Sequence, residues 1–146
     1  MSAPEKSQRE KMLAGELYLA NDPQLSAEHL RAQALLAEFN ATGADEEARR
    51  ADLLRRLLGH LGEGAVIKPT LRCDYGTNIT VGDRTFLNYD CLLLDCNRIE
   101  IGADVQFGPG VTVGERTVVG AGSVVTRDLP PRVLAVVNPC RVVREL

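Results

Sequence analysis

The second half of the chain repeats a bulky apolar residue every six positions. In "FGPGVTVGERTVVGAG" (residues 107–122), Phe107, Val113 and Val119 stand six apart, and each is followed at once by glycine. This spacing fits neither the 3.6-residue period of an α-helix nor the two-residue alternation of an ordinary strand. A six-residue period is typical of a parallel β-helix, in which each hexad forms one short strand and a turn.

The same register extends over ten apolar positions. They are Ile67, Cys73, Val81, Leu87, Leu93, Ile101, Phe107, Val113, Val119 and Val125. Three hexads close one triangular coil of about 18 residues, with the apolar side chains inside. The steps 73 to 81 and 93 to 101 are eight residues long and lie 20 residues apart, which predicts two extra residues at the same corner of successive coils. The alternative is a β-sandwich in which the six-residue period arises by chance. Chance would then have to place apolar residues at all ten positions of the register.

The residue after each inward position has its own pattern. It is glycine at positions 82, 102, 108, 114 and 120, and asparagine at position 88. We expect this residue to lie at a corner with positive φ, a conformation that glycine adopts without a Cβ penalty and that asparagine tolerates well.

Residues 1 to about 62 have helical spacing instead. In "SAEHLRAQALLAEFN" an apolar stripe is predicted at Ala27, Leu30, Ala34 and Ala37, with Ser26 as the N-cap. In "ADEEARRADLLRRLLGHLGEG" acidic residues suit the positive end of a helix, and its apolar face comprises leucines 53, 54, 57, 58 and 61.

"KMLAGELY" is a candidate for a short leading helix. The sequence therefore predicts a helical segment at 1–62, a β-helix at 63–136 and a C-terminal tail at 137–146.

Composition narrows the function classes. The 146 residues suit one domain, and a net charge of −3 without a long basic run argues against nucleic acid as the main partner. No apolar run approaches the ~20 residues that span a membrane, and the N-terminus has no signal-peptide core, so we expect a cytoplasmic protein. The four cysteines form no CxxC pair and both histidines lie upstream, so free thiols and no metal site are expected.

Three stretches, in order along nearly the whole chain, resemble the maltose and galactoside O-acetyltransferases. They are "EKMLAGELY", "LRCDYGTNITVGDRTFLNYDCLLLD" and "VGAGSVVTRDLPPRVLAVVNPCRVVREL". The resemblance implies a mainly β fold, a left-handed parallel β-helix with an N-terminal helical segment. It also implies acetyl transfer from acetyl-CoA, as co-substrate, to a sugar hydroxyl, in a homotrimer with active sites between neighbouring β-helices.

Site residues follow from the resemblance by position. On the acceptor side it implies Asp74, Asn88 and Asp95 as substrate-binding residues. For CoA it implies Ala121, Thr126 and Arg127 along the arm, and Arg141 and Arg144 near the phosphates, where arginine is the expected counter-charge. Structural alternatives remain open: Asp74 and Asn88 as corner residues, and Arg141 and Arg144 as solvated cations of the tail.

The family's general-base histidine is not found. In these enzymes it follows a "GPGV"-like hexad, whereas here "FGPGV" runs directly into "TVGERTVVGAGS", which resembles the last part of the β-helix. Roughly forty residues, about two coils and a loop, are absent relative to the family. His29 and His60 match no family position, so no catalytic residue is assigned.

Two functions remain after this observation. One is an acetyl-CoA-dependent sugar O-acetyltransferase impaired by the loss of its base, which typically costs about 10²–10⁴ in rate. The other is a catalytically inactive relative, a trimeric scaffold or a CoA-binding protein. A carbonic anhydrase of the same fold is excluded, because the β-helix carries none of the three metal-binding histidines that it needs.

Overall fold

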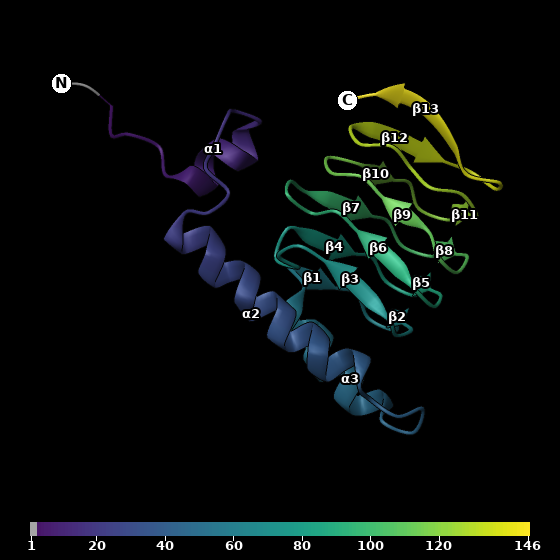
Figure 1. Cartoon of the computed structure of the whole chain (residues 1–146). Helices are drawn as coiled ribbons and strands as arrows, with labels where there is room; N and C mark the ends of the chain where they lie inside the picture. Colours follow the sequence, from purple (N-terminus) through teal and green to yellow (C-terminus); the bar gives the residue numbers. More distant parts are fainter. Residues whose placement is uncertain (1–2) are drawn as a thin grey trace.

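The computed structural model describes residues 3–146, in which three helices precede a stack of short strands (Figure 1). The helices are α1 (Gln8–Ala14), α2 (Pro23–Asn40) and α3 (Glu47–Leu57). The strands are β1 (His60–Leu61), β2 (Val66–Ile67), β3 (Leu71–Cys73), β4 (Ile79–Val81), β5 (Phe86–Leu87), β6 (Cys91–Leu93), β7 (Ile99–Ile101), β8 (Gln106–Phe107), β9 (Thr112–Val113), β10 (Val118–Val119), β11 (Val124–Val125), β12 (Val133–Val136) and β13 (Arg141–Glu145).

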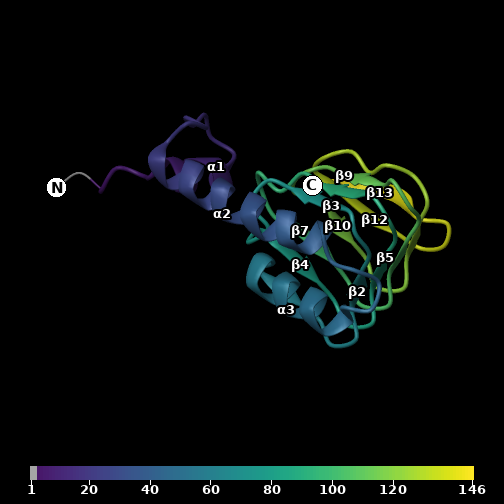
Figure 2. The ribbon, with the colours of Figure 1, turned by 60° about the horizontal axis from the view of Figure 1, so that its bottom comes forward.

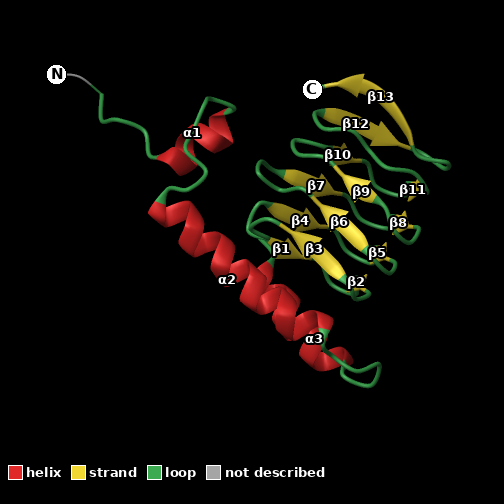
Figure 3. Ribbon diagram, in the orientation of Figure 1, coloured by secondary structure: helices red, strands yellow, loops and turns green. Residues whose placement is uncertain are grey.

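The strands form three sheets, one on each side of a prism. Sheet A has the order β1-β4-β7-β10-β12-β13, sheet B the order β11-β8-β5-β2, and sheet C the order β3-β6-β9. Every pairing is parallel except that of β12 with β13, and Figure 3 shows the strands stacked coil upon coil. The predicted fold class, a left-handed parallel β-helix with an N-terminal helical segment, is confirmed.

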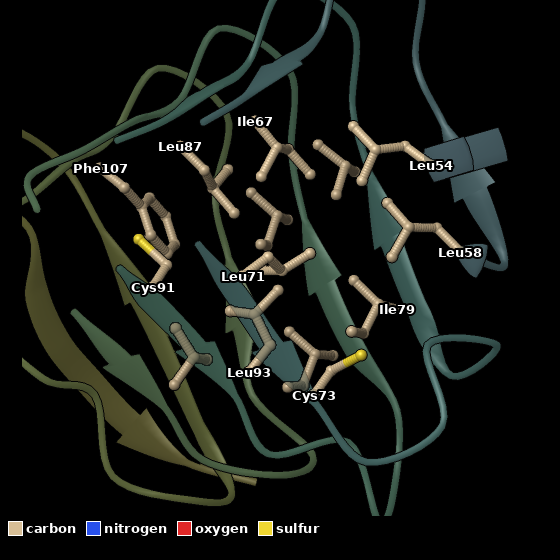
Figure 4. Close-up of a cluster of buried hydrophobic side chains, with 14 of the residues drawn as sticks. Leu54, Leu58, Ile67, Leu71, Cys73, Ile79, Leu87, Cys91, Leu93 and Phe107 are labelled. Atoms are coloured by element: carbon tan, nitrogen blue, oxygen red, sulfur yellow. The ribbon is translucent and has the colours of Figure 1, made fainter. Parts of the chain in front are cut away.

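The hexad register is confirmed at all ten positions. Each of these side chains is buried, and the least buried is Cys73 at 7% exposure. Figure 4 shows several of them pointing into the prism. Cys73 pairs with Leu93 and Val81 with Ile101, so the two eight-residue steps fall at the same corner, as predicted.

The expected reason for the glycines is wrong. Positive φ occurs two residues later, for example at Arg84 (φ 56) and Asp104 (φ 56). A Cβ on Gly82 would instead lie 2.4 Å from the backbone nitrogen of Ala103, one coil away. At Gly82, Gly102 and Gly114 the backbone of the neighbouring coil lies too close for a Cβ, which explains glycine at these three positions.

The predicted apolar stripe of α2 is also wrong. Its buried residues are Leu25, Ala32, Leu35, Leu36 and Phe39, while the predicted stripe lies on the exposed side. Burying leucine and phenylalanine removes far more apolar surface from water than burying alanine, so the bulky residues determine the buried face. The N-cap is Asp22, not Ser26, because Asp22 accepts hydrogen bonds from the N–H groups of Gln24 and Leu25 and Pro23 starts the helix.

Helices α2 and α3 close the lower end of the prism. Leu53, Leu54, Leu57 and Leu58 are buried as predicted and join the core of the β-helix, whereas Leu61 lies on β1 because the helix ends at Leu57. Figure 2, turned toward this end, shows both helices lying across it. The leading helix is α1, which begins before "KMLAGELY" and ends at Ala14, with Gly15 (φ 75) as its C-cap.

The structure places two segment boundaries at other residues than the predicted divisions 1–62, 63–136 and 137–146. Strand β1 already pairs with β4, so the coils begin at His60. Residues 141–145 of the expected tail form β13, which pairs antiparallel with β12 at the upper end of sheet A. Among residues 3–146 no helix combines the length and apolarity needed to cross a membrane.

Candidate active site

Two edges of sheet C carry most of the predicted site residues. The C–A corner, where the chain passes from sheet C to sheet A, comprises residues 74–78 and 94–98 and holds Asp74 and Asp95. The B–C corner, where the chain enters sheet C, comprises residues 68–70, 88–90, 108–111 and 126–128 and holds Asn88, Thr126 and Arg127.

Asp95 links the two extended loops of the C–A corner. It is fully buried, and its Oδ1 accepts hydrogen bonds from the backbone N–H groups of Asp74 (2.8 Å) and Tyr75 (2.9 Å). Its backbone oxygen accepts from Asn78 Nδ2 at 2.8 Å. Burial raises the pKa of the Asp95 carboxyl, although the N–H groups of Tyr75 and Asp74 oppose this effect. In this chain Asp95 therefore positions the loop that carries Asp74.

The Oδ2 atom of Asp95 is buried and has no hydrogen-bond partner within residues 3–146. A buried carboxylate oxygen without a partner costs free energy, so the chain keeps this group despite a penalty.

Asp74 lies half-buried above Asp95 and has polar neighbours from three segments. Its Oδ2 accepts from the Cys96 thiol at 3.6 Å, and its backbone oxygen lies 2.9 Å from His29 Nδ1 on α2. The ring of Tyr75 meets the His29 ring edge-on, with centroids 6.2 Å apart. Burial, with the charge of Asp74, raises the pKa of Cys96 to about 11, so this thiol is protonated at neutral pH and is a poor nucleophile.

Polar side chains of α2 cap the free edge of β3. Gln33 Nε2 donates to the backbone oxygen of Cys73 (3.0 Å), and Asn40 Nδ2 donates to that of Leu71 (2.9 Å) while its Oδ1 accepts from the Leu71 N–H (2.8 Å). His29 extends this row to Asp74. Because β3 is the outer strand of sheet C, these contacts satisfy backbone groups that would otherwise be unpaired.

A groove of about 430 Å³ lies between α2 and sheet C. His29, Gln33, Asn40, Arg72 and Asp74 supply its polar lining. Sequence reasoning missed this groove and gave His29 no role, although the spacing 29, 33 and 40 does place three polar residues on one helix face.

The remaining predicted residues lie elsewhere. Asn88 is half-buried, and its Oδ1 accepts from the Tyr89 N–H at 2.8 Å. Thr126 and Arg127 are exposed at the same corner, two coils further along the stack. The other three predicted residues are also exposed but lie away from this corner: Ala121 follows β10, and Arg141 and Arg144 lie on β13.

The structure thus brings Asp74 and Asp95 together but separates them from Thr126 and Arg127 by the width of sheet C. Among residues 3–146 no group of three histidine, cysteine or acidic residues could hold a metal ion.

A prism of hexad coils closed by a helical segment is the architecture of the hexapeptide-repeat acetyltransferases. Residues 11–62 match the profile described as the maltose acetyltransferase hexapeptide capping motif, and residues 97–127 match the bacterial transferase hexapeptide.

Three similar proteins extend these matches along the chain. Nodulation protein L of Rhizobium meliloti (strain 1021) is 37% identical over 94% of this chain and 98% of its own length. The crystal structure of a maltose O-acetyltransferase from Clostridium difficile 630 is 37% identical, with a TM-score of 0.65 over 97% of this chain and 98% of that one. A hexapeptide-repeat acetyltransferase from Vibrio cholerae O1 biovar eltor, complexed with acetyl-CoA, is 31% identical, with a TM-score of 0.63 over 97% and 99%. The chain belongs to the maltose/galactoside O-acetyltransferase family.

The alignment with nodulation protein L also measures a difference in length. It spans 179 positions, to which this chain contributes about 137 residues, 94% of its 146. About 42 positions (179 less 137) therefore face no residue of this chain. This is the size of the absence that the sequence predicts after "FGPGV".

Proposed function

We propose that the chain is an acetyl-CoA-dependent O-acetyltransferase. It esterifies a hydroxyl of a sugar or a similar small molecule, at a rate reduced by the absence of the family's histidine base. The observation that carries the proposal is the C–A corner: Asp95 is kept buried with an unpartnered oxygen, and its bonds hold Asp74 in place.

Acetyl-CoA is the co-substrate. The Vibrio cholerae relative was crystallised with it, and the coils of this chain nearest the upper end carry exposed arginines, among them Arg127, Arg141 and Arg144. Guanidinium groups bind phosphate oxygens through paired N–H donors, which suits the pyrophosphate and 3′-phosphate of CoA. Thr126 and Ala121 line the path of the pantetheine arm.

The reaction is acyl transfer between oxygen and sulfur. The acceptor hydroxyl oxygen attacks the thioester carbonyl carbon, the C–S bond breaks, and the hydroxyl proton passes through a base to the departing thiolate. Asp74 and Asn88 orient acceptor hydroxyls by hydrogen bonds, and Asp95 fixes the loop of Asp74.

A complete site requires more than one copy of the chain. Asp74 and Thr126 lie at opposite edges of sheet C, on the first and fourth coils. Adjacent coils are about 4.8 Å apart, so the vertical separation alone is about 14 Å. A homotrimer in which the B–C corner of one copy faces the C–A corner of the next brings the two halves together.

The second candidate is a catalytically inactive trimer that binds CoA. It is favoured by one observation, that the β-helix from β2 onward contains no histidine.

The test is release of free CoA from acetyl-CoA, separated by chromatography, with and without maltose, glucose and a galactoside. The proposal predicts acceptor-dependent release, and a rise in the KM for acetyl-CoA in Arg127→Gln. The matched control is Arg55→Gln, an exposed arginine on α3. CoA binding by calorimetry without any acceptor-dependent release would establish the inactive relative instead.

A further inference from the structure

We propose that His29 is the general base of this chain. The inference rests on the acetyl transfer proposed above, and it assigns the proton-accepting role to a helix residue that lies outside the repeated coils. Three observations carry it: the orientation of the imidazole, the groove that it lines, and its link to Asp95.

The hydrogen bond of His29 leaves one particular ring nitrogen available. Nδ1 lies 2.9 Å from the backbone oxygen of Asp74, and a carbonyl oxygen can only accept, so Nδ1 carries the hydrogen. In the neutral ring the lone pair is then on Nε2, which has no hydrogen-bond partner within residues 3–146. An imidazole held at one nitrogen with the other free is the usual arrangement of a side-chain base.

The imidazole is open to a ligand on the acceptor side. His29 is exposed and lines the groove between α2 and sheet C together with Gln33, Asn40, Arg72 and Asp74. These amide, guanidinium and carboxylate groups suit a ligand rich in hydroxyl groups, which must both donate and accept hydrogen bonds.

A row of contacts fixes the position of the ring. Asp95 Oδ1 binds the N–H groups of Asp74 and Tyr75, the Asp74 carbonyl binds His29, and Tyr75 packs edge-on against the ring. Buried Asp95 is therefore a positioning residue for the base. The other histidine, His60, lies on β1 in sheet A and does not line this groove.

The proton balance of the step is complete. Nε2 takes the proton of the acceptor hydroxyl as its oxygen bonds to the acetyl carbonyl carbon. The C–S bond then breaks, and the imidazolium returns the proton to the CoA sulfur, so that the products are the acetyl ester, CoA thiol and neutral imidazole. The titratable and charged groups around His29 are Arg72, Cys73 and Asp74 in the groove, Tyr75 against the ring, and Cys96 on Asp74.

The test uses His29→Gln and His29→Ala, with Gln24→Ala, an exposed position of α2 outside the groove, as the matched control. Glutamine can still donate to the Asp74 carbonyl but cannot accept a proton near neutral pH. Gln24→Ala removes a side-chain contact on the same helix, Nε2 to Glu28 Oε1 at 3.1 Å, without removing a base. Thermal unfolding checks that all three variants fold.

We expect both His29 variants to lose at least about 100-fold in kcat while the KM for acetyl-CoA stays within about twofold. Added imidazole should restore part of the activity of His29→Ala, and the rising limb of the pH–rate profile should disappear in His29→Gln. Gln24→Ala should keep nearly the activity of the parent chain.

Two results would overturn the assignment and leave the proposed function standing: a kcat unchanged in His29→Gln, or an equal loss in Gln24→Ala. A parent chain without acceptor-dependent turnover would overturn both proposals together.

Discussion

Replacing Gly82 with alanine tests how the coils are held together. The added Cβ would lie 2.4 Å from the Ala103 nitrogen and from the Gly102 carbonyl carbon, both backbone atoms of the next coil. Ordinary contact begins at 3.4 Å, so the coils must separate by about one ångström at this point. That movement also breaks the hydrogen bond from the Gly82 N–H to the Ile101 oxygen, now 2.8 Å.

The expected cost combines both effects. Overpacking costs about 1–3 kcal/mol, and a lost hydrogen bond about 1 kcal/mol, so Gly82→Ala should lower the free energy of unfolding by about 3 kcal/mol. Urea unfolding followed by circular dichroism measures this, at one fixed protein concentration because assembly shifts apparent stability.

Gly108→Ala is the matched control. Gly108 has the same place in its hexad and the same kind of hydrogen bond, to the Val125 oxygen at 2.8 Å, but its Cβ would meet nothing closer than 3.6 Å. Its effect should lie within about 0.5 kcal/mol of zero. Gly122→Ala, in open space at φ +74, should cost about 1–2 kcal/mol through backbone strain alone. Equal losses for Gly82→Ala and Gly108→Ala would refute coil contact as the reason for these glycines.

Three further predictions follow from the site and its supports. Because burial raises the pKa of Asp95, the folded state keeps the carboxyl proton to higher pH than the unfolded state does. The stability that protonated Asp95 contributes is therefore lost as the pH rises from about 4 through the pKa of the folded state. The stability of the parent chain relative to Asp95→Asn should therefore fall over that range in pH-dependent urea unfolding, and a constant difference would contradict the burial effect. Asn40→Ala leaves two backbone groups of Leu71 unpaired and should lower the free energy of unfolding by about 1–3 kcal/mol, whereas a shift below 0.5 kcal/mol would show that water replaces the amide. With a pKa raised from 9.0 to about 11, Cys96 should be alkylated about 100-fold more slowly at pH 8 than an unperturbed thiol, as mass spectrometry of the labelled peptides can measure; labelling at the unperturbed rate would place Cys96 outside its polar cluster.

The coil register could be predicted from the sequence because one apolar side chain per hexad must enter a narrow prism. Phe107, Val113 and Val119 satisfy that requirement wherever the neighbouring coils lie, so the period alone determines which residues are buried. The extra residues at one corner could be predicted for the same reason, since 73 to 81 and 93 to 101 break the period equally.

The contacts between adjacent coils, and between α2 and the elements it packs on, could not be predicted in the same way. The reason for Gly82 depends on Ala103 in the next coil, which no local pattern shows. On α2, alanines and leucines occur on both faces, so the buried side was decided by packing on α3 and β3. The contact of His29 with Asp74 depends on that packing, which is why the groove escaped sequence reasoning.

The row of α2 side chains along β3 also bears on how the molecule avoids fibre growth. A stack of parallel coils is open at both ends, and either end could template the coil of another molecule. At the lower end, Gln33 and Asn40 occupy backbone groups of β3 that an incoming strand would need, and His29 occupies the oxygen of Asp74 just after it. At the upper end, β13 reverses direction against β12, so the first coil of a second molecule finds no parallel register to continue. The same repeat that would make this chain a building block for filaments is thus terminated at both ends by residues outside the repeat.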